Sequence, residues 1–231
     1  MNTHFRQGVR HGIPIGLGYL SVSFAFGMQA VNSGLTVMQA VLISMTNLTS
    51  AGQAAAVPLI VANAPMIEMI LTQLTINLRY ALMSLSLTRK LDDTMTTGRR
   101  MFFSFANTDE IFAVASGQPG KVGKDYLFGL MVMPWIGWTL GTLLGSAAGS
   151  ILPEFVRNAL GIALYGMFLA IILPPAREKK PVRFVVVIAV ALSLGFHYLP
   201  ALKEISSGFA IILCAVTAAA LGAWLFPVKE E

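Results

Sequence analysis

The chain has 231 residues, of which 55% are hydrophobic and only 12% are charged, and its formal net charge is +5. Soluble domains carry about 25% charged residues, so this composition excludes a soluble protein and predicts an all-α polytopic membrane protein. The basic residues lie at the ends of apolar runs, where they anchor cytoplasmic loops, and this placement excludes a nucleic-acid-binding protein.

The residue types and short motifs point away from catalysis. Cys214 is the single cysteine and lies within an apolar run, so neither a disulfide nor a thiolate metal site is expected. The short motifs of zinc proteases, serine hydrolases and nucleotide-binding loops are absent from the sequence. We therefore expect no enzyme, no metal and no other cofactor, and we expect residues 1–231 to form a single transmembrane domain.

The N-terminal segment contains the first predicted membrane span. Arg6 and Arg10 precede it and place the N-terminus in the cytoplasm. The span itself, residues 12–31, is apolar and contains glycines at four-residue spacing. Such glycines favour close packing against another helix, although a kinked segment beside a substrate path would contain them too.

Residues 35–62 form an apolar stretch with a polar interruption at its centre, from Thr46 to Gln53. Ser50 and Gly52 belong to this interruption. Polar backbone at membrane depth is tolerated only where it is buried in protein or lines a cavity, and broken helices of this kind form binding sites in transporters. We therefore predict a broken or re-entrant segment here. The alternative is a plain span whose Ser and Thr side chains bond to their own helix.

Residues 64–87 are long enough to cross a bilayer, but they include Glu68 and Arg79. An Arg at the centre of a span costs about 2.5–3.5 kcal/mol on insertion scales, so Arg79 should face protein or water rather than lipid. Helical spacing places polar residues on two faces of this segment, which should therefore lie inside a bundle beside a polar cavity. We expect Glu68 near the outer mouth, at the membrane interface; the alternative is that it attracts cations there.

The loop that follows carries four basic residues and is predicted to be cytoplasmic. Residues 101–116 come next; they are too few to span comfortably and they hold the adjacent carboxylates Asp109 and Glu110. A cytoplasmic hairpin that dips into the bundle accounts for both observations. The alternative is an amphipathic helix on the membrane surface, with both acids in water.

Four further apolar segments complete the chain: residues 126–149, 156–173, 184–199 and 207–226. We predict about six full transmembrane helices plus two broken or re-entrant segments, or seven or eight spans if the partial segments cross, with both termini in the cytoplasm. In the first of the four, glycines recur at every fourth position and should form a flat face that packs tightly against another helix, in this chain or in a partner. These glycines are Gly137, Gly141, Gly145 and Gly149.

Three short motifs occur in order along the first half of the chain. They read Ser50-Ala51-Gly52-Gln53, Asn77-Leu78-Arg79-Tyr80 and Thr108-Asp109-Glu110. Their order and spacing resemble those of the AzlC family, the large subunits of bacterial branched-chain amino acid exporters. The sequence departs from the family pattern at Tyr80, where the family has His, and in the order of its small residues before Gln53.

The resemblance implies a multi-pass protein of the bacterial inner membrane that exports branched-chain or related neutral amino acids: valine, leucine, isoleucine and, as a related substrate, methionine. It also implies a small AzlD-type membrane partner, and export coupled to an ion gradient, for which the proton is the first candidate. From the residues alone we would expect only a polytopic carrier of small charged solutes, surrounded by lipid. A channel and a non-transporting structural subunit are the alternatives.

A zwitterionic amino acid needs one group for its carboxylate and another for its ammonium. Arg79 can bind a carboxylate with two hydrogen bonds, and a helix N-terminus at Gly52 and Gln53 could do the same with backbone N–H groups. Asp109 or Glu110 could receive the ammonium or carry a coupling proton. The competing interpretation is that Arg79 only neutralises one of these carboxylates inside the protein. The complete set of candidate substrate-binding or coupling residues is Ser50, Gly52, Gln53, Asn77, Arg79, Asp109 and Glu110.

Overall fold

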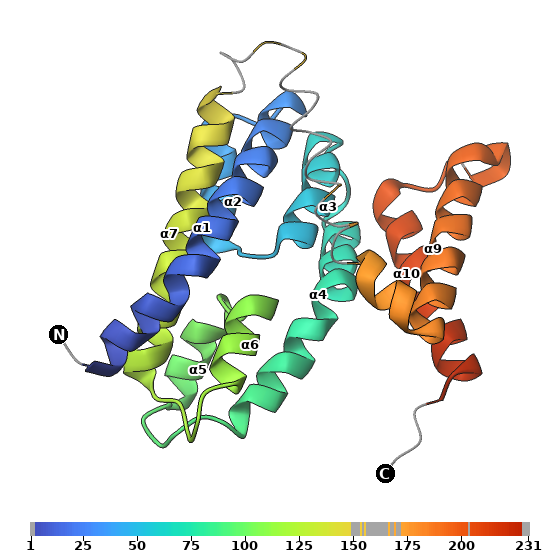
Figure 1. Cartoon of the computed structure of the whole chain (residues 1–231). Helices are drawn as coiled ribbons and strands as arrows, with labels where there is room; N and C mark the ends of the chain where they lie inside the picture. The colour runs from blue at the N-terminus through green and yellow to red at the C-terminus, as the bar shows by residue number, and fades with distance from the viewer. Residues whose placement is uncertain are drawn as a thin grey trace. The chain divides into compact units, whose positions relative to one another are not determined.

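The computed structural model describes residues 3–148, 153, 155, 166, 169, 172–202 and 204–227. Apart from one isolated bridge between Leu91 and Val122, the regular structure of these residues is helical (Figure 1). The chain forms two compact units, each assembled from two stretches of sequence. The first unit comprises residues 1–57 and 77–164, and the second comprises residues 58–76 and 165–231.

Four helices within the described residues are long and apolar enough to cross a membrane: α1 (Thr3–Asn32), α7 (Lys124–Ala148), α9 (Lys180–Tyr198) and α10 (Ser207–Leu225). They coincide with four of the predicted spans, and the prediction of an all-α membrane protein is confirmed. The predicted span 156–173 falls largely outside the described residues. Helix α4 (Met66–Thr88) has 23 residues and contributes to both units.

Helices α1 and α7 run parallel and pack closely, and together they form the framework of the first unit (Figure 1). Glycines permit this approach: a Cβ added at Gly12 or Gly16 would lie 2.6 Å from a backbone carbonyl oxygen of α7. On α7, the glycines that face α1 are Gly137, Gly141 and Gly145. They lie against the backbone of α1, which leaves no room for a side chain at these positions. These glycines of α7 thus make their close contact within this chain. Gly149 lies outside the described residues.

The polar interruption in the second apolar stretch is a sharp reversal between two short helices, α2 (Val37–Thr46) and α3 (Ser50–Val61). The side-chain oxygen of Asn47 accepts hydrogen bonds from the backbone N–H and the hydroxyl of Thr49, at 3.2 and 2.8 Å, and so stabilises the turn. Ala40 of α2 and Val57 of α3 belong to one core cluster together with side chains of α1. The segment is a broken helix that forms a hairpin (Figure 1).

A second hairpin is formed by α5 (Thr97–Ser104) and α6 (Asp109–Ser116), in the region where a hairpin was predicted. Its turn meets the turn of the first hairpin: Leu48 of the first belongs to a buried cluster against which Phe105 of the second packs. The other members of this cluster come from α1 and α7. The two hairpin tips therefore meet beside the framework of the first unit.

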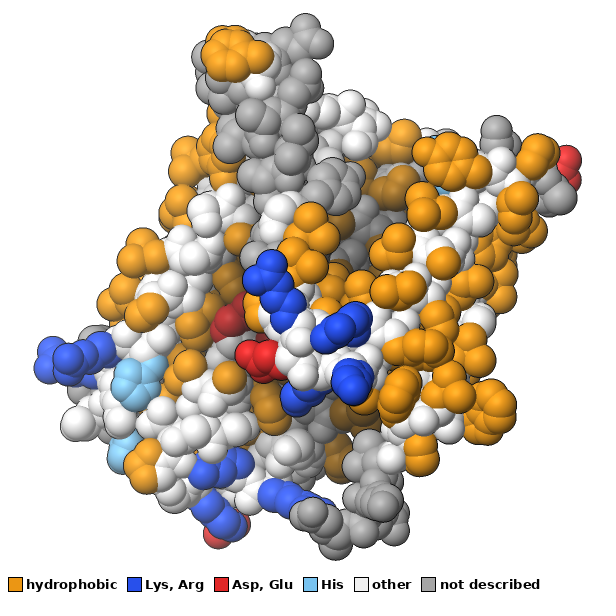
Figure 2. All heavy atoms as spheres, turned by 45° about the vertical axis from the view of Figure 1, so that its right-hand side comes forward, with side chains coloured by type: hydrophobic (Ala, Val, Ile, Leu, Met, Phe, Trp, Pro, Cys, Tyr) orange, Lys and Arg blue, Asp and Glu red, His pale blue; other side chains and the backbone are white. Residues whose placement is uncertain are grey.

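In the second unit, α9 and α10 pack against each other and are joined through a short 3-10 helix, η1 (Pro200–Leu202). Gly222 of α10 lies beside the side chain of Val185 on α9. Large hydrophobic side chains of both helices are exposed, among them Val187 on α9 and Val216 on α10. Figure 2 shows hydrophobic side chains spread over one face of the molecule. Such a surface is expected where helices contact lipid.

Glu68 lies at the N-terminal end of α10, inside the second unit. Its side chain is only 2% exposed, and its Oε1 accepts hydrogen bonds from the Ser206 hydroxyl at 2.5 Å and from the Gly208 N–H at 2.9 Å. A carboxylate is stabilised at a helix N-terminus, where backbone N–H groups lack partners. The structure gives Glu68 partners at the start of α10, and its place relative to the membrane interface stays a prediction. Helical spacing identified the polar face of α4 but not the element that packs against it.

Candidate functional site

The candidate site lies in the first unit, where α6 begins. Thr108 caps this helix, with its hydroxyl oxygen 3.5 Å from the backbone nitrogen of Ile111, and Asp109 and Glu110 occupy the first turn. Carboxylates in the first turn of a helix are stabilised by the helix dipole. Successive residues point about 100° apart around a helix, so the two carboxylates reach different neighbours.

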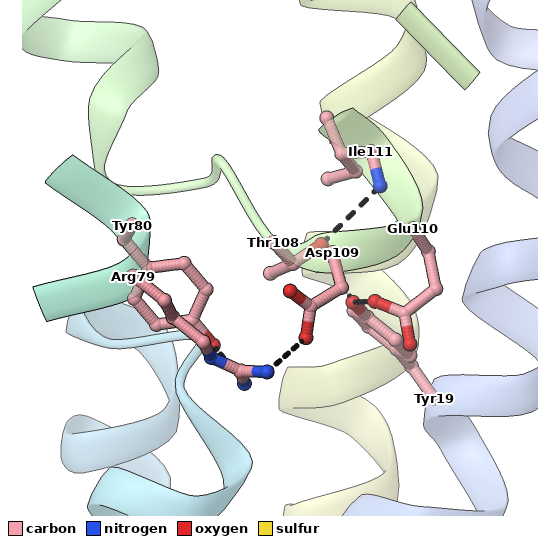
Figure 3. A network of polar contacts seen from close by, with 7 residues as sticks. All are labelled: Tyr19, Arg79, Tyr80, Thr108, Asp109, Glu110 and Ile111. Atoms are coloured by element: carbon pink, nitrogen blue, oxygen red, sulfur yellow. Dashed lines mark hydrogen bonds and ion pairs between the residues drawn. The ribbon is translucent and has the colours of Figure 1, made fainter. Parts of the chain in front are cut away.

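Asp109 forms an ion pair with Arg79 of α4 (Figure 3). Nη1 of Arg79 lies 2.7 Å from Oδ2 of Asp109, while Nη2 donates a hydrogen bond to the Tyr80 hydroxyl at 3.2 Å. The Arg79 guanidinium also lies over the Tyr80 ring, 4.9 Å from its centre. The side chains of Arg79 and Asp109 are 49% and 48% exposed, so both present surface to a small solute.

Asp109 lies outside the four long apolar helices, and its surroundings favour its protonated form. Burial raises the pKa of Asp109 above its ordinary value, and the nearby Glu110 acts in the same direction, although the charge of Arg79 opposes the shift. Asp109 therefore takes up a proton more readily than a carboxylate in water would.

Glu110 points toward α1 rather than toward Arg79 (Figure 3). The hydroxyl of Tyr19, a buried residue of α1, donates a hydrogen bond to Oε2 of Glu110 at 2.5 Å. The same hydroxyl lies 2.7 Å from Oγ1 of Thr108. Tyr19 thus contacts both the cap of α6 and one of its two acidic side chains, and it fixes the start of this helix against the framework helix α1.

Gln53 belongs to a second polar cluster, which is buried between α2, α3 and α7. Its Oε1 accepts a hydrogen bond from Nε1 of Trp138 at 2.9 Å, and its Nε2 donates to Oγ of Ser44 at 3.1 Å. Ser44 in turn shares a hydrogen bond of 2.7 Å with the hydroxyl of Thr142. Because the amide of Gln53 uses both its ends on buried partners, this cluster holds the first hairpin against α7.

The structure thus brings three of the seven candidate residues together, namely Arg79, Asp109 and Glu110. It places Gln53 in the separate buried cluster. Of the other three, Ser50 and Gly52 are in the first turn of α3, and Asn77 is half-buried on α4 itself, two positions before Arg79.

Two aromatic residues that connect these groups carry no motif in the sequence. The ring of Tyr19 packs edge-on against the indole of Trp138, with the ring centroids 5.2 Å apart. Each lies in a long apolar segment, where an aromatic side chain is ordinarily part of a core or faces lipid. Their only signal is a polar tip within an apolar span, which usually requires a hydrogen-bond partner when buried.

Comparison with known proteins identifies relatives. The model of the family described as AzlC protein matches residues 14–152. The inner membrane protein YgaZ of Escherichia coli is 26% identical over 183 residues, which cover 76% of this chain and 75% of that protein. An uncharacterized membrane protein of Archaeoglobus fulgidus is 31% identical over 197 residues, 84% of this chain and 85% of that protein.

A further relative, from Bacillus subtilis, is named branched-chain amino acid transport protein AzlC. It is 26% identical over 182 residues, which cover 76% of this chain and 70% of that protein. No solved structure matches the chain.

Proposed function

Since the chain belongs to the AzlC family, a family of membrane transport, we propose that it is the large subunit of an exporter of branched-chain or related neutral amino acids. The substrates would include valine, leucine, isoleucine and methionine. The name of the Bacillus subtilis relative supports this class. A small membrane subunit of the AzlD type would complete the exporter. The protein would cross the inner membrane several times and keep both termini in the cytoplasm.

The observation that carries this proposal is the ion pair between Arg79 and Asp109. A zwitterionic amino acid has one positive and one negative group, so it can insert between the two side chains. Its carboxylate would meet the guanidinium of Arg79, which can bind it with two hydrogen bonds, and its ammonium would meet Asp109. In the empty site the two side chains neutralise each other, which avoids an unpaired charge in the protein.

We assign the coupling proton to Asp109 or Glu110. Protonation of Asp109 would remove the charge that binds the substrate ammonium, so a proton and the substrate would exclude each other at this carboxylate. Because the pKa of Asp109 is raised by burial, a proton can compete for this position. Glu110, whose Oε2 accepts the hydrogen bond from the Tyr19 hydroxyl, is the alternative carrier.

The proposal is tested by efflux of amino acids from cells preloaded with dipeptides. The chain is expressed alone, with its small partner, and with the partner in an Arg79→Ala or an Arg79→Lys form. We expect partner-dependent export of valine, leucine, isoleucine or methionine that is lost in both variants, since Lys keeps the charge but lacks the planar fork of Arg. Arg89→Lys, in the exposed loop after α4, is the matched control and should export normally.

Three results would contradict parts of the proposal. Absence of any amino acid export, with both chains verified in the membrane, would reject the substrate class. Normal export by Arg79→Lys would reject bidentate binding of the carboxylate. Export that is insensitive to an uncoupler would reject coupling to a proton gradient and favour a channel.

A further inference from the structure

A mostly apolar cavity of about 250 Å³ lies in the first unit, between α4, α5, α6 and α7. Its walls are formed largely by buried aliphatic and Met side chains. Six of these are Leu87, Leu91, Met95, Ile111, Leu127 and Met131. A cavity of about 150 Å³ lined by such side chains is large enough to hold a benzene molecule, so this one has room for a branched four-carbon chain.

One polar side chain in the cavity wall has a buried oxygen atom that lacks a hydrogen-bond donor. Asn107, which is 7% exposed, donates from Nδ2 to the Ser84 hydroxyl at 2.9 Å, but its buried Oδ1 accepts no hydrogen bond. A buried acceptor without a donor is unfavourable and rare in folded proteins. Arg100 also borders the cavity, and its Nε donates to the Met95 carbonyl oxygen at 2.9 Å. Among the described residues, the cavity thus offers a mostly apolar chamber with one buried acceptor that lacks a donor.

Two residues of the cavity wall lie near the charged site along the chain. Asn107 lies two positions before Asp109 in the tip of the second hairpin, and Ser84 lies five positions after Arg79 on α4. Five helical residues span about 7.5 Å along the axis, which is about the length of an amino acid with an aliphatic side chain. A substrate held between Arg79 and Asp109 would reach the cavity with its side chain.

We propose that this cavity is the side-chain pocket of the exporter, and that Asn107 Oδ1 accepts a hydrogen bond from the substrate ammonium. The inference rests on the proposed function and extends it from the backbone of the substrate to its side chain. An acyl chain of a lipid would also fill an apolar chamber, but it has no donor for Asn107. An amino acid supplies both the donor and the aliphatic group.

The test changes the size of the pocket and follows selectivity in the full chain with its small partner. Leu87→Phe narrows the cavity and Leu87→Ala widens it; the same two changes at Leu85, 70% exposed on the same helix, are the controls. We expect Leu87→Phe to lower export of leucine and methionine about tenfold relative to alanine, and Leu87→Ala to raise export of phenylalanine relative to leucine. The Leu85 variants should keep the ratios of the unmodified protein.

The acceptor is tested separately with Asn107→Leu, which keeps the size of the side chain and removes its oxygen. We expect export of every amino acid to fall by a similar factor, about tenfold, because the ammonium is common to all of them. Membrane expression is compared for all variants, and Leu87→Ala with the milder Leu87→Val carries the test if Leu87→Phe does not accumulate.

Ratios of export that stay within twofold in all Leu87 variants would overturn the pocket while leaving the exporter intact. Unchanged export by Asn107→Leu would overturn the role of its Oδ1. If the unmodified protein with its partner exports no amino acid at all, the proposed function fails and the pocket fails with it.

Discussion

The ring of Tyr19 meets the indole of Trp138 edge-on, with centroids 5.2 Å apart and ring planes at 75°. Hydrogen bonds lead from this pair to both hairpins: the Tyr19 hydroxyl donates to Glu110, and Trp138 Nε1 donates to Gln53. Tyr19 belongs to α1 and Trp138 to α7, and glycines allow the backbones of these two helices to pack in direct contact. One rigid contact thus positions a polar residue from each hairpin, which is the support that a precise binding site requires.

Tyr19→Phe should lower export while leaving the fold intact. The substitution keeps the ring that packs against Trp138 and removes the hydroxyl that donates to Glu110. A hydrogen bond to a charged group contributes about 1.5–3 kcal/mol to stability, so we expect a lower unfolding temperature and a fall in export of about tenfold or more in protein that still folds. Efflux assays and thermal unfolding of the purified complex measure the two effects.

Tyr126→Phe is the matched control for this change. Tyr126 is also buried between α1 and α7, and its hydroxyl forms a 2.8 Å hydrogen bond with His11, away from the acidic residues of α6. The Tyr126→Phe protein should therefore export amino acids at the normal rate. Equal losses in both variants would show that any hydroxyl between these helices matters, and the specific role of Tyr19 would be rejected.

A double-mutant cycle separates the two roles open to Arg79. If Arg79 binds the substrate carboxylate and Asp109 the ammonium, then Arg79→Ala, Asp109→Ala and the double variant should all lose most export. If Arg79 only neutralises Asp109, each single variant leaves an unpaired charge in the protein and the double variant removes it. The second interpretation therefore predicts recovery of folding and export in the double variant.

The cycle is measured as initial efflux rates with membrane expression as the reference for folding. Recovery of export in the double variant to within about twofold of the unmodified protein would reject Arg79 and Asp109 as substrate ligands. If the cycle shows a coupling energy for membrane expression while all three variants lack export, Arg79 and Asp109 both stabilise the protein and bind the substrate.

The sequence allowed the elements of the fold to be predicted better than their contacts. Hydropathy located the long helices, and the polar interruption indicated the broken segment of residues 35–62, because polar backbone in an apolar segment has few stable arrangements. The second hairpin was predicted from the short length of residues 101–116 and from their two adjacent carboxylates. Arg79 was expected to have a partner because a charged side chain is costly inside an apolar span, and a carboxylate was among the expected partners. Tyr19 and Trp138 could not be singled out, since they lie in apolar spans over 100 positions apart along the chain and only their packing shows their role.

Gly141→Val should destabilise the contact between α1 and α7. A Cβ at Gly141 would overlap the backbone of Leu20, and neither helix can move without disturbing its other glycine contacts. Overpacking of this kind costs about 1–3 kcal/mol or more, so we expect a lower unfolding temperature and reduced yield of the purified protein. Gly18→Val is the control, because a Cβ at Gly18 of α1 meets no atom within 4 Å. Equal destabilisation by both variants would show that the close contact is not the cause.

Glu68 provides the last prediction, which concerns the second unit. Glu68→Leu removes the acceptor of the Ser206 hydroxyl and of the Gly208 N–H, and each buried donor left unpaired costs about 1–3 kcal/mol. Glu68→Gln keeps one oxygen in place and should destabilise the protein less. Thermal unfolding measures both, with Glu178→Leu, an exposed position outside α4 and α10, as the control that should leave the unfolding temperature unchanged.

The same variants decide whether Glu68 has only this structural role. If Glu68 serves as the cap of α10, export should follow stability, and Glu68→Gln should therefore export nearly as well as the unmodified protein. A Glu68→Gln protein that unfolds at the normal temperature but exports nothing would instead require an ionisable carboxylate at this position. That result would move the coupling proton from Asp109 or Glu110 to the N-terminus of α10.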